Sequence, residues 1–166
     1  MSQDNQANLN EDAKKLTSIL KKSVEPDIDI LELQKECALF STRISKYSDS
    51  DRLYLSKVGL LFNELVLATW DDYVENLEKF ETTEYTPSAG NEKIQNIIME
   101  LGKYGLKLEM DEEIPGAREM LFEMKQSLSE TKYKEMLKQV RTWIKSDLDS
   151  TYESIFAKDC KLDADT

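Results

Sequence analysis

Acidic side chains gather in one short stretch of the chain, where Asp71, Asp72, Glu75 and Glu78 follow one another closely. Hard cations such as Mg²⁺ are held by several carboxylate oxygens that converge on one point, so these four residues are the candidate metal ligands. A step of three residues, however, turns successive helical side chains by about −60°, and such a series winds around a helix instead of lining one pocket. A solvated helix end is therefore the simpler interpretation.

Two families of all-α enzymes have acidic motifs similar to parts of this cluster. The run from Asp71 to Glu75 resembles the aspartate-rich magnesium motif of the all-α isoprenoid synthases over five residues. Glu75 with Glu78 resembles the first acid pair of the all-α nucleotide pyrophosphohydrolases. Both families use a second acidic motif, and no matching one follows in this sequence. Neither activity is therefore carried over, and a divalent-cation-dependent hydrolase is kept only as an alternative.

The sequence lacks the residues on which most catalytic sites depend. It contains no His, the commonest general base and metal ligand, and no Gly-rich phosphate loop or paired Cys ligands. The segment from Asp147 begins like a calcium-binding loop, but Tyr152 stands where that loop needs Gly and Lys158 where it needs an acid. We therefore expect a protein that is not an enzyme, with no catalytic residue and no cofactor.

The net charge favours some classes of partner over others. Lys and Arg number 22 against 33 Asp and Glu, which gives a net charge of −11. Such a field repels nucleic acids and anionic membranes and attracts basic protein surfaces. The longest apolar stretch, residues 58–70, is interrupted by Asn63 and Glu64 and is too short to span a bilayer. We expect a basic or mixed-charge protein partner, no nucleic acid and no membrane.

Residues that bind this partner are expected where the chain is irregular or leaves the core. A second acidic patch precedes Pro115 and Gly116, where connector residues are free to meet a cationic partner; alternatively, these acids complement the dipole of the next helix. Two aromatic side chains are the ones that the sequence most suggests as exposed interface anchors, although core packing is the simpler role for both. The candidate partner-binding residues are Trp70, Tyr85, Glu109, Asp111, Glu112 and Glu113.

Helices must position these residues, because apolar side chains recur at steps of three and four along most of the chain. The face from Ile30 to Tyr47 is the most regular of these stripes and is expected to pack in the core, with self-association through it as the alternative. Residues 106–110 alternate with period two, which we interpret as an extended connector rather than a strand. Helices are expected over about 10–24, 30–47, 51–80, 94–104, 117–128 and 130–144, with 151–158 as a bent continuation or a separate helix.

Few residues are available for turns, since the chain contains 5 Gly and 3 Pro. This composition disfavours sandwiches, barrels and dinucleotide-binding folds. We predict an all-α fold: a single-domain bundle of six or seven helices with one long central helix and at most one short extended segment near 106–110. Residues 9–160 are expected to form the bundle, 1–8 to be disordered and 161–166 to be a frayed tail.

The sequence thus favours a small, acidic, non-enzymatic interaction protein, for example a binding module, inhibitor, immunity protein or chaperone. Cys37 and Cys160 have no paired spacing and are expected to be reduced thiols. Because no basic start followed by an apolar run opens the chain, we expect a cytoplasmic location. The alternatives are the cation-dependent hydrolase and a structural protein that self-associates through the Ile30 to Tyr47 face.

Overall fold

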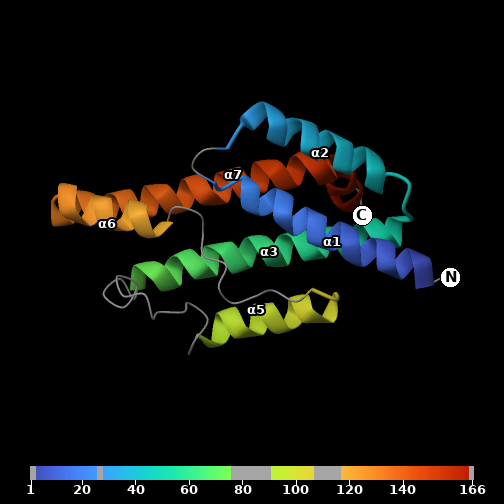
Figure 1. Cartoon of the computed structure of the whole chain (residues 1–166), viewed down its shortest axis with the longest axis horizontal. Coiled ribbons are helices and arrows are strands. Elements are labelled where there is room, and N and C mark those ends of the chain that lie inside the picture. Colours follow the sequence, from blue (N-terminus) through green and yellow to red (C-terminus); the bar gives the residue numbers. More distant parts are fainter. Residues whose placement is uncertain (1–2, 26–27, 76–90, 107–116, 165–166) are drawn as a thin grey trace.

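Helices make up almost all of the described chain (Figure 1). The structure, a computed structural model, describes residues 3–25, 28–75, 91–106 and 117–164. No strand occurs within these ranges, and the predicted all-α bundle is confirmed. The helices are α1 (Gln3–Lys22), α2 (Ile30–Ile44), α3 (Asp49–Glu75), α5 (Glu92–Lys103), α6 (Ala117–Ser127) and α7 (Glu130–Ala164).

The central element is α3, which agrees with the long central helix that the sequence predicted. It packs against α1, α5 and α7, while α2 lies on α7 and α1, and α6 lies on the first part of α7. With 27 residues, α3 is about 40 Å long. Leu55, Val58 and Phe62 of α3 join one cluster of buried side chains to which all the other described helices contribute. The apolar surface removed from water in this cluster is the main stabilising term of the fold.

Residues close by in the chain define two of the helix ends. The Asp29 carboxylate accepts hydrogen bonds from the backbone N–H groups of Leu31 and Glu32 at 3.1 and 3.3 Å, so it caps the start of α2. At the end of α5, Gly105 adopts a φ of +82°, which only Gly takes up readily. Leu106 then folds back, and its N–H donates to the Leu101 carbonyl at 3.3 Å.

The described helices extend towards both ends of the chain. α1 begins at Gln3 and α7 continues to Ala164, and disorder over 1–8 and a frayed tail over 161–166 stay predictions. Neither helix contains a Gly or a Pro that would stop it. The predicted extended segment 106–110 lies outside the described residues except for Leu106, as do residues 76–80 of the predicted third helix.

The last part of the chain is a bent continuation of α7, one of the two predicted arrangements. Phe156 has non-helical dihedral angles, φ −111° and ψ 21°, and marks the kink. Beside the kink, the Ser41 hydroxyl of α2 donates a hydrogen bond to the Ile155 carbonyl at 3.1 Å. This bond joins α2 to α7 where the two helices run side by side.

Candidate functional site

Trp70 is buried, and the expectation that it is exposed is wrong. Only 1% of its surface is accessible, although it stands near the end of α3. Neighbouring helices surround α3 along its described length, so the helix does not leave the core at Trp70. Trp70 therefore packs in the core, which was the alternative role, and cannot anchor a partner on this surface.

The acidic cluster of α3 does not converge on one point. Asp71 accepts two hydrogen bonds from the Arg141 guanidinium of α7, at 2.7 and 3.1 Å. Asp72 is buried and accepts a hydrogen bond from the Asn91 amide, the N-cap of α5, at 2.8 Å. No group of three or more metal-binding side chains occurs in the described ranges. Glu75 is exposed, and Glu78 lies outside the described residues.

The remaining candidate partner-binding residues lie outside the part of the chain that the structure describes. These are Tyr85, Glu109, Asp111, Glu112 and Glu113, and their roles stay predictions.

The regular face of α2 packs in the core, as expected. Cys37, Phe40 and Ile44 are buried, and Tyr47 is half-buried against them. Ile30, at the start of this face, differs because 63% of its surface is exposed. Self-association through the whole face would therefore require α2 to leave the bundle.

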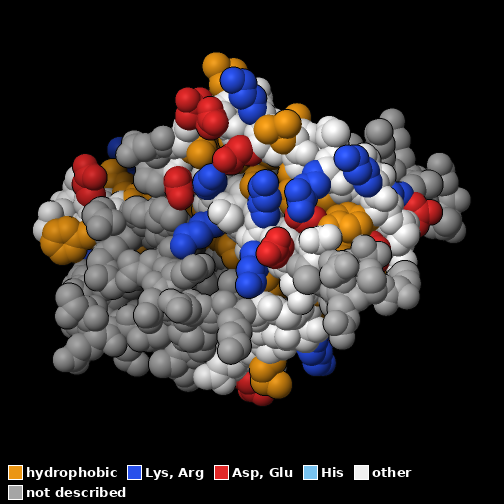
Figure 2. All heavy atoms as spheres, turned by 45° about the vertical axis from the view of Figure 1, so that its right-hand side comes forward, with side chains coloured by type: hydrophobic (Ala, Val, Ile, Leu, Met, Phe, Trp, Pro, Cys, Tyr) orange, Lys and Arg blue, Asp and Glu red, His pale blue; other side chains and the backbone are white. Residues whose placement is uncertain are grey.

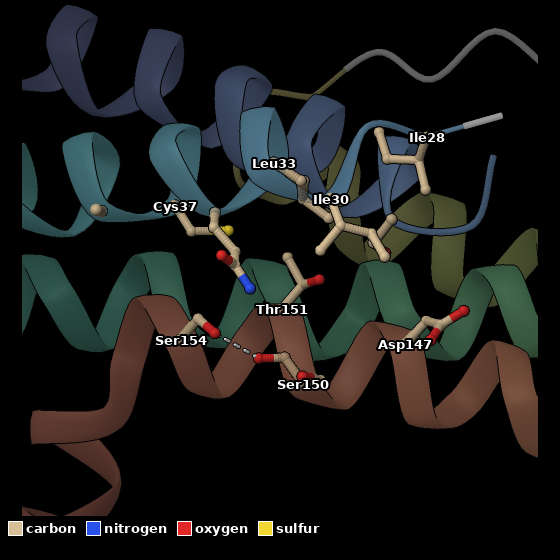
Figure 3. A pocket seen from close by; sticks show the side chains of 11 residues that line it. Ile28, Ile30, Leu33, Cys37, Asp147, Ser150, Thr151 and Ser154 are labelled. Atoms are coloured by element: carbon tan, nitrogen blue, oxygen red, sulfur yellow. Dashed lines mark hydrogen bonds between the residues drawn. The ribbon is translucent and has the colours of Figure 1, made fainter.

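A groove of about 460 Å³ lies between α2 and α7 (Figure 3). Side chains from α2 and from the connector that precedes it form a largely apolar wall, and α7 forms a polar wall. We call this hollow the α2–α7 groove. It is lined by Ser23, Ile28, Ile30, Leu33, Gln34, Cys37, Ala38, Asp147, Ser150, Thr151 and Ser154.

The chemistry of the α2–α7 groove suits binding better than bond breaking. Burial, followed by the charge of Glu36, raises the pKa of the Cys37 thiol, so the thiol is protonated and weakly nucleophilic at neutral pH. The Ser154 hydroxyl donates to the Ser150 carbonyl at 2.9 Å, within α7 itself. No base orients either serine among the residues that line the groove.

Asp147 is the charged residue among those that line the groove, and none of the others is a Lys or Arg. Burial raises the pKa of its carboxyl group above the ordinary value. Its neighbours on α7 are paired: Lys145 binds Asp149 at 2.6 Å, and Arg141 binds Asp71. Within the described ranges, no ion pair or hydrogen bond is formed by the Asp147 carboxylate. The groove therefore holds one carboxylate without a neutralising partner.

Trp143 of α7 is a surface residue. It is 51% exposed. The buried stripe of α7 runs through Val140, Ile144 and Leu148, and Trp143 falls beside it. Steps of four and three residues from Trp143 lead to Asp147 and Ser150, so these side chains share one face of α7.

Positive charge covers part of this acidic protein. Figure 2 shows Lys and Arg side chains gathered across the middle of one face, over α1 and the end of α2. Exposed Lys14 and Lys15 of α1 and Arg43 of α2 belong to the basic side chains of these elements. The net charge of −11 is therefore not spread uniformly over the surface.

A buried carboxylate ties α1 to α2 beneath these basic side chains. Asp12 is 1% exposed and accepts hydrogen bonds from Arg43 Nε at 2.8 Å and from the Tyr47 hydroxyl at 2.5 Å. Burial, followed by the hydrogen bond to Asp12 and the charge of Asp12, raises the pKa of Tyr47 to about 12. The folded protein therefore holds this phenolic proton more tightly than the unfolded chain does.

We expect the Tyr47→Phe variant to lose less stability at alkaline pH than the unaltered protein. The contribution of the raised pKa is fully present below the ordinary value of 10.0 and is lost as the pH rises towards about 12. The free energy of unfolding, measured by urea denaturation at several pH values, should thus fall less steeply for the variant across this window. Lysines titrate there in both proteins and cancel in the difference. Parallel slopes would contradict the assignment.

Comparisons with family models, curated proteins and solved structures found no match to this chain. None of the described helices has the length and apolar character needed to cross a membrane.

Proposed function

We propose that this protein is a non-enzymatic interaction module that binds a segment of a partner protein in the α2–α7 groove. The observation that carries the proposal is the groove itself, with its apolar wall on α2 and its polar wall on α7. Helix pairs with an apolar groove between them commonly receive an amphipathic segment, whose apolar face enters the groove. The proposal keeps the predicted partner class, a basic or mixed-charge protein.

Exposed apolar side chains beside the groove support a macromolecular ligand. Single exposed apolar residues are normal on any surface. Ile30, however, lines the groove and is 63% exposed, and Trp143 is 51% exposed on the face of α7 that also carries Asp147 and Ser150. A small molecule would leave such side chains in water, whereas a protein segment could cover them.

A cytoplasmic location is part of the same proposal. The free thiol of Cys37 is compatible with a reducing compartment. The metal-dependent hydrolase receives no support from the contacts of Asp71 and Asp72, which are engaged by Arg141 and Asn91.

Blocking the groove should abolish binding without unfolding the protein. Gln34 is exposed and lines the groove, so an indole at this position would fill the space between α2 and α7. Peptides selected from a displayed random library on the full chain should lose at least about tenfold in affinity for the Gln34→Trp variant. Fluorescence anisotropy of the labelled peptides gives the dissociation constants.

The matched control is Gln126→Trp, the same change at an exposed position of α6. This variant should bind the selected peptides as tightly as the unaltered protein does. Far-ultraviolet circular dichroism should show that both variants are folded. The proposed function would be wrong if the library yielded no peptide that distinguishes the two variants.

A further inference from the structure

We propose that Asp147 is the specificity-determining residue of the α2–α7 groove and selects partner segments that place a lysine or arginine against its carboxylate. This inference rests on the proposed function and adds the chemistry of the ligand to it. The occupant is thus a short amphipathic protein segment that carries apolar anchors and one basic side chain at a defined position.

The charge distribution of the groove leads to this ligand. Asp147 is the acidic residue among those that line the groove, and no Lys or Arg lines it. Asp147 is exposed at the surface of the groove, where a cation on the ligand can reach its carboxylate and form a direct charge-assisted hydrogen bond to it. A neutral segment would cover the carboxylate without compensating for the lost water, and an acidic segment would be repelled.

No structural role within the described residues accounts for an acid at this position. Asp147 lies in the interior of α7, far from both ends of the helix, so it neither caps the helix nor complements its dipole. Aspartate is also a poor residue for a helix interior. The other acid of this turn, Asp149, differs because it has an ion-pair partner in Lys145.

The groove also defines where the basic side chain should stand. Figure 3 shows Asp147 at one end of the row of α7 residues and Ser154 at the other, with Cys37 of α2 opposite Ser154. Seven residues of helix separate Asp147 from Ser154, which corresponds to about 10 Å. A helical ligand therefore needs its basic residue about two turns from the apolar side chain that enters beside Cys37.

The test uses the library peptides that bind the full chain and are lost on Gln34→Trp. We expect their sequences to share a lysine or arginine at one fixed position relative to the apolar residues. Replacing Asp147 with Asn should weaken these peptides about tenfold or more. The matched control, Asp149→Asn, removes an acid from another face of the same helix and should leave the affinity unchanged.

A charge exchange separates recognition from a structural effect. The Asp147→Lys variant should bind the lysine peptide weakly and should regain affinity for the same peptide with glutamate at that position. Two results would overturn the role of Asp147 and leave the proposed function intact. In the first, the peptides are lost on Gln34→Trp but have no lysine or arginine at a common position. In the second, they bind the Asp147→Asn variant as tightly as the unaltered protein. A library without any peptide sensitive to Gln34→Trp would overturn both.

Discussion

Replacing Trp70 with Ala should lower the free energy of unfolding by about 3–5 kcal/mol, the usual cost of truncating a large buried aromatic side chain. Trp70 is 1% exposed and belongs to the central core cluster. The vacated space would be only partly refilled by its neighbours, since protein interiors are close-packed. Because a domain of this size is stabilised by only about 5–15 kcal/mol, the loss should be large in urea denaturation followed by circular dichroism.

The control for this prediction is Trp143→Ala on the groove side of α7. Trp143 is 51% exposed, so its loss should alter stability far less but weaken peptides that bind the α2–α7 groove. The chain has 2 Trp, and each variant therefore retains one emitting residue. Emission should be blue-shifted in Trp143→Ala and red-shifted in Trp70→Ala. Equal losses of stability in the two variants would contradict the assignment of Trp70 to the core.

We expect Asn63→Leu to raise the free energy of unfolding by about 1–3 kcal/mol, because it removes a buried polar group without hydrogen-bond partners, and such a group usually costs this much. Asn63 is 6% exposed in α3, and neither its amide nitrogen nor its amide oxygen has a hydrogen-bond partner within the described ranges. Leucine has the same branching as asparagine and needs no partner. Urea denaturation at neutral pH measures the change.

The same substitution at Asn91 should have the opposite sign. The Asn91 side chain accepts from the Ile94 N–H at 3.1 Å and donates to Asp72, so it caps α5 and contacts a buried acid. Asn91→Leu should lower the free energy of unfolding by about 0.5–2 kcal/mol through the lost cap alone. A stabilised Asn91→Leu variant, or a destabilised Asn63→Leu variant, would show that these hydrogen-bond assignments do not govern stability.

The parts of the fold that depend on neighbouring residues in the chain could be predicted from the sequence. The apolar stripe of α2, the cap at Asp29 and the termination of α5 at Gly105 each result from residues within a few positions of one another. The interior position of α3 was also predictable, because its first half is apolar on nearly every side.

The candidate site could not be predicted in the same way, because it depends on helix packing. The groove is formed by residues 28–38 and 147–154, which are more than 100 positions apart in the chain. Nothing in the local pattern shows that these segments lie side by side or that Asp147 lacks an ion-pair partner. Trp70 illustrates the limit, because this candidate interface residue is buried, whereas Trp143 is the exposed tryptophan.

The hydrogen bond between Ser41 and Ile155 limits the length of the segment that the α2–α7 groove could bind. It brings α2 and α7 into direct contact immediately beyond Ala38 and Ser154, so the α2–α7 groove is closed at that end. A long continuous helix that lay along the groove would clash with α2 and α7 at this contact. Under the proposed function, a segment that ends at this contact therefore fits the α2–α7 groove better than one that continues past it.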